Sequence, residues 1–188
     1  MFFKAKNGAT SPREDLGHLA VTDARAGDTL SIVGVGDEYA DLDFTSDRRN
    51  SMEAGDRKWF ELSGMYKERR VYVEVEAGDE VSVRGMFDGK RFTLDELGLS
   101  EDDMAAIDER QNPSDNFEFQ NKVWMYRWSR EVGVFTDGNE TGRGYYGWVF
   151  QEQGGKRLLA IRKYEGEPFT AAVLLPVNPG DVTVFRGQ

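Results

Sequence analysis

The chain lacks cysteine entirely, and histidine occurs once, as His18, among its 188 residues. The absence of cysteine excludes disulfides, thiolate metal sites and a cysteine nucleophile. A single histidine gives little basis for a histidine-based metal centre or a catalytic triad. We therefore expect no metal site and no cofactor, and we place His18 on the surface of an N-terminal lead-in.

Long apolar runs are also missing. No stretch approaches the ~20 apolar residues that a membrane-spanning helix needs. The polar run after Met1–Lys4 leaves no room for the apolar core of a signal peptide. At 39% hydrophobic and 31% charged residues, the composition is typical of a globular domain rather than of a disordered chain. We expect a cytoplasmic protein that does not insert into a membrane.

Positive charge is scarce relative to negative charge. The 24 Lys and Arg residues stand against 34 Asp and Glu residues, which gives a formal net charge of -10. This balance argues against a nucleic-acid partner, because phosphate contacts rely on Lys and Arg. Residues 93–121 hold nine acidic residues and one basic residue, a net charge of -8 that leaves -2 for the rest of the chain. The acidity is therefore a local property.

Short segments of alternating polarity, separated by Gly, Asp and Asn, make up most of the sequence from Gly27 onward. In the clearest of them, Val71, Val73 and Val75 are expected to face inward while Tyr72, Glu74 and Glu76 face outward. Strands at this regular spacing are typical of an antiparallel β-barrel or sandwich. We predict about eleven strands, at residues 29–35, 38–44, 57–63, 70–76, 81–87, 117–128, 130–136, 143–153, 156–164, 169–173 and 182–185.

One region departs from this β pattern. Thr93 with Glu96, and Ser100 with Asp103, have the spacing of capping boxes, which begin helices. We predict one or two short helices within 93–110, ended by Asn112-Pro113. The fold class is then mainly β, with one short helical insertion at 93–121. A single β-rich domain spans 24–188, and a flexible lead-in occupies 1–23.

Two internal similarities suggest pseudo-repeated halves. The pattern Gly27-Asp28, five residues, Gly34 recurs from Gly78 to Gly85 and from Gly180 to Gly187. In addition, Trp59–Gly78 resembles Trp148–Gly166 when one inserted residue is allowed. Gly-Asp turns are also common in unrelated β proteins, because Gly and Asp both favour turns. A barrel built from two related halves is the alternative that the repeats favour.

Candidate catalytic groups are few. Glu61, Glu74 and Glu76 could cluster as a carboxylate pair for acid–base chemistry, although alternation alone does not fix their separation. The acids around Asp41 lack the Gly and Glu that a calcium-binding EF-hand loop requires. No serine has the context of a nucleophile elbow. We therefore assign no catalytic residue and expect a protein that is not an enzyme.

Aromatic residues are the strongest compositional feature. Trp124, Tyr126 and Trp128 alternate along one predicted strand, as Tyr146, Trp148 and Phe150 do along another. Such rows can form a stacking platform for bases, sugars or a peptide, or they can form a cross-strand aromatic core. We favour the core, with Trp128 near a groove at the barrel mouth. If a ligand binds, the candidates are Trp124, Tyr126, Trp128, Tyr146 and Trp148.

Six short motifs follow one another along the chain: Gly27-Asp28, Trp59-Phe60-Glu61-Leu62, Val71-Tyr72-Val73-Glu74, Leu94-Asp95-Glu96-Leu97-Gly98-Leu99, Tyr146-Gly147-Trp148 and Leu159-Ala160-Ile161. Their order resembles a bacterial family named domain of unknown function 4178. The similarity covers about residues 24–186 and rests on structural motifs rather than on catalytic ones. The resemblance implies an accessory role near membrane-stress and polyamine-synthesis proteins, and it carries over no catalytic residue.

Three functions stay open at this point. The first, which we favour, is a non-enzymatic binding or scaffolding domain of a bacterial stress or defence system. It would dock a protein partner through Asp102, Asp103, Asp108 and Glu109. The second is a sensor or enzyme for a polyamine, nucleotide or sugar, with Glu61 and Glu74 facing an aromatic groove. The third is an acidic inhibitor that mimics nucleic acid. The oligomeric state is left open.

Overall fold

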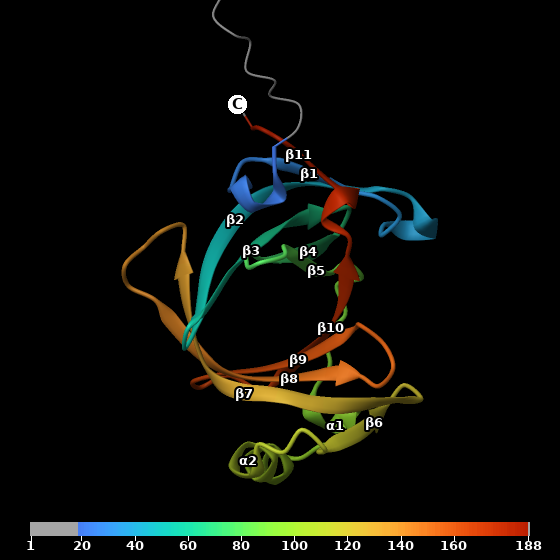
Figure 1. Cartoon of the computed structure of the whole chain (residues 1–188), viewed down its shortest axis with the longest axis vertical. Coiled ribbons are helices and arrows are strands. Elements are labelled where there is room, and N and C mark those ends of the chain that lie inside the picture. Colours follow the sequence, from blue (N-terminus) through green and yellow to red (C-terminus); the bar gives the residue numbers. More distant parts are fainter. Residues whose placement is uncertain (1–18, 188) are drawn as a thin grey trace, which may run out of the picture.

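A computed structural model describes residues 19–187, in which eleven strands and two α-helices form one body (Figure 1). Two α-helices, α1 (Leu94–Leu97) and α2 (Glu101–Arg110), lie between β5 and β6. The strands are β1 (Thr29–Ile32), β2 (Leu42–Ala54), β3 (Arg57–Tyr66), β4 (Arg69–Glu76), β5 (Ser82–Met86), β6 (Asn116–Phe119), β7 (Lys122–Thr136), β8 (Arg143–Glu152), β9 (Leu158–Tyr164), β10 (Thr170–Val177) and β11 (Val182–Phe185).

Eight of these strands close into an antiparallel barrel. They pair in the order β2-β3-β4-β5-β10-β9-β8-β7, and a further pairing of β7 with β2 completes the ring. The remaining strands lie outside the ring: β1 and β11 extend from β2, and β6 extends from β7. The predicted mainly β class is confirmed, and the architecture is a barrel rather than a sandwich.

The connectivity runs through the same pattern twice. The chain from β1 to β5 and the chain from β6 to β10 each form a meander of five strands, and the last strands of the two halves, β5 and β10, pair with each other. The similar segments Trp59–Gly78 and Trp148–Gly166 fall on equivalent hairpins, β3–β4 and β8–β9. The Gly-Asp copies do not mark the halves, because two of them precede β1 and β5 within the same half.

An apolar layer covers the barrel wall formed by β2–β5. The outer faces of these strands pack against β1, β11 and the 3-10 turn Val21–Asp23. Val71, Val73 and Val75 belong to this outer cluster. The predicted burial of these valines is confirmed, although the core that they enter lies between the barrel wall and its covering layer. The outward direction predicted for Glu74 and Glu76 was wrong, because both side chains join the ion pairs of the barrel interior. Alternation identifies the two faces of a strand but not which of them lines the barrel.

The helices and β6 cover the opposite wall (Figure 1). Leu94, Leu97, Met104 and Ile107 pack with Trp124 and the apolar side chains of β8–β10. Both predicted capping boxes are present, so each helix begins where the sequence placed it. Of the described residues, none belongs to a helix that is long and apolar enough to cross a membrane.

Several strand boundaries differ from the sequence-based expectation. The predicted strand at 38–44 begins only at Leu42, because Asp37–Tyr39 form a 3-10 turn, and it continues to Ala54. The predicted strands at 117–128 and 130–136 are instead β6 and one long β7, joined by a tight turn at Gln120-Asn121 in which both residues have positive φ.

The packed chain also begins before the predicted boundary at residue 24. Leu19 forms a bridge with Val184 on β11, and Val21 is buried. Just after this segment, Asp28 is 1% exposed and accepts hydrogen bonds from Arg186 and from the backbone N–H of Gly187. The rest of the predicted lead-in, with His18, lies outside the described residues.

Candidate functional site

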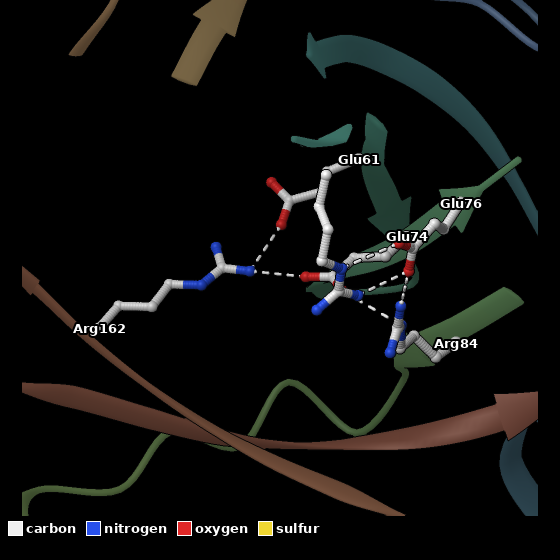
Figure 2. A network of polar contacts seen from close by, with 6 residues as sticks. Glu61, Glu74, Glu76, Arg84 and Arg162 are labelled. Carbon is white, nitrogen blue, oxygen red and sulfur yellow. Dashed lines mark hydrogen bonds and ion pairs between the residues drawn. The ribbon is translucent and has the colours of Figure 1, made fainter. Parts of the chain in front are cut away.

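A network of charged side chains crosses the barrel interior (Figure 2). Arg162 on β9 extends toward β3 and β4, which lie on the opposite wall of the ring. Its Nη2 lies 3.1 Å from Glu61 Oε2 and 2.8 Å from Glu74 Oε1. On the neighbouring strand, Arg84 Nη2 lies 2.7 Å from Glu76 Oε2. The carboxylates that the sequence identified as a possible cluster are thus brought together.

Additional contacts complete this network at both ends. Arg57 forms a bidentate pair with Glu76, with distances of 3.1 and 2.8 Å. Asn50 donates to Glu61 and accepts a hydrogen bond from Thr136. Three arginines therefore face three glutamates, and the charges balance when all six are ionised. Sequence reasoning missed these arginines because they lie on different strands, up to 101 residues from their partners.

Burial and charge act against each other on the glutamates. Burial raises the pKa of Glu74 above its ordinary value, although Arg162 and Arg84 oppose this effect. Glu76 is less buried, and its hydrogen bonds with Arg57 hold its pKa below the ordinary value. Each carboxylate is occupied by at least one guanidinium. The network therefore offers no free general base, and no group of carboxylates in residues 19–187 has the arrangement of a metal site.

Little space remains around the network. A cavity of about 30 Å³ lies beside it, lined by Trp59, Trp128 and Tyr145 together with Glu74 and the arginines. Trp59 is 8% exposed, and its indole N–H has no hydrogen-bond partner among residues 19–187. Within the same range Arg84 Nε also lacks a hydrogen bond, although it lies 3.5 Å from Glu74 Oε2. This volume suits a water molecule or a small ion, since a water needs only ~10–15 Å³.

The predicted aromatic rows lie in two different places. Trp124, Tyr126, Tyr146 and Trp148 pack beneath the helices, and Trp124 and Trp148 are 1% and 6% exposed. A β-bulge between Tyr126 and Trp128 shifts the register, so Trp128 points to the opposite face and joins the cluster with Trp59. The interpretation of these rows as an aromatic core is confirmed. Tyr146 also lines a hollow of about 530 Å³, together with Tyr145 and Tyr164.

The four acidic candidates on α2 have different environments. Asp102 and Glu109 are exposed. Asp103 closes the capping box with Ser100. Asp108 accepts hydrogen bonds from the hydroxyls of Ser129 and Tyr146, which attach the helix to the barrel. Burial and this carboxylate raise the pKa of Tyr146 to about 12.

A further feature that the sequence did not indicate is a hollow of about 240 Å³ on the outer surface, where β5 and β10 join the two halves of the barrel. We call it the seam groove. Leu175 on β10, which pairs with Gly85 on β5, contributes to its apolar part. Its lining consists of Val35, Gly36, Asp37, Arg69, Phe87, Asp88, Lys90, Phe92, Gln120, Arg157, Val173 and Leu175.

The loop between β1 and β2 forms one wall of the seam groove and carries Tyr39, which is 90% exposed. Glu38 and Tyr39 have φ values of 55° and 62°, a conformation that non-glycine residues adopt at a cost. Asp37 is held by Lys67 and Arg69, each at 2.6 Å. A Cβ at Gly36 would lie 2.8 Å from the carbonyl oxygen of Ala40, so the turn requires glycine. The loop is thus fixed while its aromatic side chain is left in solvent.

No protein-family model, curated protein or solved structure matches this chain. The resemblance to the domain of unknown function 4178 family therefore stays a prediction.

Proposed function

We propose that this chain is a non-enzymatic domain that docks a protein partner through the loop that carries Tyr39. The observation that carries the proposal is the exposure of Tyr39 on a strained and braced loop. Residues held at positive φ cost ~1–3 kcal/mol each and persist where the surroundings impose them. Tyr39 is exposed, so the strain holds in solvent an aromatic side chain of the type enriched at interaction hot spots.

The barrel interior supports the same proposal by its small volume. Pockets for small organic ligands occupy roughly 300–1,000 Å³, whereas the interior cavity measures about 30 Å³. A polyamine, nucleotide or sugar would have to displace buried ion pairs to enter. The carboxylates that an enzyme would use are also held by Arg57, Arg84 and Arg162. The accessory role in a bacterial stress or defence system rests on the family resemblance alone.

Site-specific photo-crosslinking tests the docking proposal in the cells that produce the protein. A photoreactive phenylalanine analogue replaces Tyr39 in one variant and Asp102 on α2 in a second. We expect a discrete crosslinked protein from the Tyr39 position only. Crosslinking from Asp102 alone would instead support docking through the acidic helix α2. Two hypotheses from the sequence require that result: docking through the acidic residues of this helix, and an acidic inhibitor that mimics nucleic acid. The absence of a crosslink from both positions would contradict the docking function.

A second candidate function, the sensing of a very small ligand inside the barrel, is favoured by one observation. The unpaired N–H groups of Trp59 and Arg84 belong to residues that line the same cavity, and buried donors are normally satisfied. A thermal-shift screen of halides and small oxyanions tests this candidate. A stabilising anion should lose its effect in Trp59→Phe but keep it in Trp148→Phe, whose N–H is also unpaired but lies in the outer cluster.

A further inference from the structure

The apolar part of the seam groove is suited to an apolar side chain from a partner. Leu175 is 37% exposed, and Phe92, Val173 and Val35 are half-buried beside it. Phe87 is buried beneath them and supports this surface. The groove lies on the outer surface where β5 and β10 pair. Because both strands belong to the closed ring, their pairing holds the base of the groove. It therefore provides a rigid apolar surface that the described chain does not cover.

A group of charged side chains flanks the groove on each side, and the two groups have the same arrangement, although only Asp37, Arg69 and Arg157 among them line the groove itself. On one side, Asp37 pairs with two cations, Lys67 and Arg69. On the other, Glu152 pairs with Arg157 at 2.7 Å and with Lys122 at 3.3 Å. These cations hold the pKa of each carboxyl group at about 2, so both carboxylates stay ionised. Each group therefore keeps one positive charge in excess.

Lys90 and Asp88 also line the groove and offset each other in charge, so the groove and its flanking pairs keep five cations against three carboxylates, a net charge of +2. The backbone N–H of Lys90 donates to Asp88, and within residues 19–187 its ammonium group forms no ion pair. The excess positive charge of the groove contrasts with the chain as a whole, whose net charge is -10. A positively charged patch next to an apolar surface is complementary to a ligand that carries negative charge beside an apolar group.

From this arrangement we infer that the seam groove binds an acidic peptide segment of the partner, in which carboxylates flank an apolar side chain. This inference rests on the proposed docking function and names the chemistry of the partner. The carboxylates contact the cations on the two sides, and the apolar side chain contacts Leu175 and Phe92. A nucleic acid is disfavoured, because the apolar surface between the cations offers a phosphate no partner.

Fluorescence anisotropy with three synthetic peptide pools tests this inference on the full chain. The first pool has Asp and Glu around a central Leu or Phe, the second replaces the acids with Lys, and the third replaces the apolar residue with Ser. We expect binding of the first pool only, weakened by added salt. Lys90→Glu should weaken this binding about tenfold, since rim charges govern association and its salt dependence. Arg25→Glu, at another exposed cation outside the groove, should leave it unchanged.

Other outcomes separate this inference from the docking function. Equal binding of the first and third pools, with competition by duplex DNA, would overturn it in favour of a general polyanion site. Crosslinking from Tyr39 without binding of any acidic pool would overturn the assignment of the partner's chemistry and leave the docking function intact. Loss of both signals would contradict docking itself. A Leu175→Ser variant adds a test of the apolar contact, with thermal unfolding as the check that the strand still pairs.

Discussion

The barrel interior and the seam groove use the same kinds of side chain, and they differ in balance and in access. Inside the barrel, three arginines meet three glutamates, and side chains such as Glu61 and Arg162 are 4% and 12% exposed. At the groove, Asp37 and Glu152 are each shared by two cations, and Lys67 and Lys122 are more than half exposed. A balanced and buried network holds a structure together, whereas an unbalanced and open one is able to attract a ligand. Charged residues alone therefore do not identify a binding site; their stoichiometry and exposure do.

The largest effect should follow the loss of Arg162. Arg162→Met leaves Glu61 and Glu74 without their shared partner inside the barrel. Breaking a buried ion pair from one side costs about 3–5 kcal/mol, so we expect a loss of this size in the free energy of unfolding, measured with urea. Arg143→Met, which removes an exposed pair with Glu167, is the control and should change stability far less. Equal losses in the two variants would show that the interior ion pairs contribute no more to stability than an exposed pair does.

A smaller effect should appear in the pH dependence of stability. Burial raises the folded-state pKa of Glu74, so the folded state binds a proton that the unfolded state has released. Stability should therefore fall as the pH rises from the ordinary glutamate pKa of about 4.5 through the raised folded value. Glu74→Gln should lack this pH-dependent contribution to stability. The difference in unfolding free energy between the wild type and this variant should therefore change with pH between the unfolded and the folded pKa of Glu74. A difference that is constant with pH would contradict the raised pKa.

A still smaller effect should come from the braced loop. Glu38→Gly relieves one residue at positive φ, although glycine also makes the unfolded chain more flexible. We expect a gain in unfolding free energy of up to about 1 kcal/mol, measured by thermal unfolding, with crosslinking from Tyr39 retained. Clear destabilisation would mean that the strained backbone has another role.

The smallest effect on stability should accompany the charge reversal in the groove. Lys90→Glu breaks no ion pair among the described residues, so the unfolding free energy should change by less than about 0.5 kcal/mol. The same substitution is expected to weaken binding of the acidic peptide pool. A large loss of stability would show that Lys90 stabilises the fold as the interior arginines do. The groove and the interior would then not differ in what their charges contribute to stability.

Local patterns in the sequence predicted much of the fold. Alternation located the strands, and the spacing of Thr93 with Glu96 and of Ser100 with Asp103 located both helices. The direction in which a strand faces was less accessible, because in β4 both faces are buried and alternation cannot tell covering layer from interior. The bulge after Tyr126 was also missed, since its effect depends on pairing with β8.

The candidate site was predictable only in part. The clustering of Glu61, Glu74 and Glu76 was recognised as possible, whereas Arg162 is brought to them by ring closure between distant strands. The seam groove gave no sequence signal, because its two walls come from segments more than 80 residues apart, near Arg69 and Arg157.

The pairing of β1 with β11 has a consequence for synthesis of the protein. Val182–Phe185 lies between β1 and Leu19, so the outer layer over the barrel cannot form until this last strand has left the ribosome. Until then, the edge of Thr29–Ile32 stays open to other chains, and non-local pairing of this kind also folds slowly. A nascent chain that stalls before β11 is therefore the species most exposed to aggregation. Once β11 has paired with β1, Arg186 and Gly187 donate hydrogen bonds to Asp28, and the edge of β1 is no longer open to other chains.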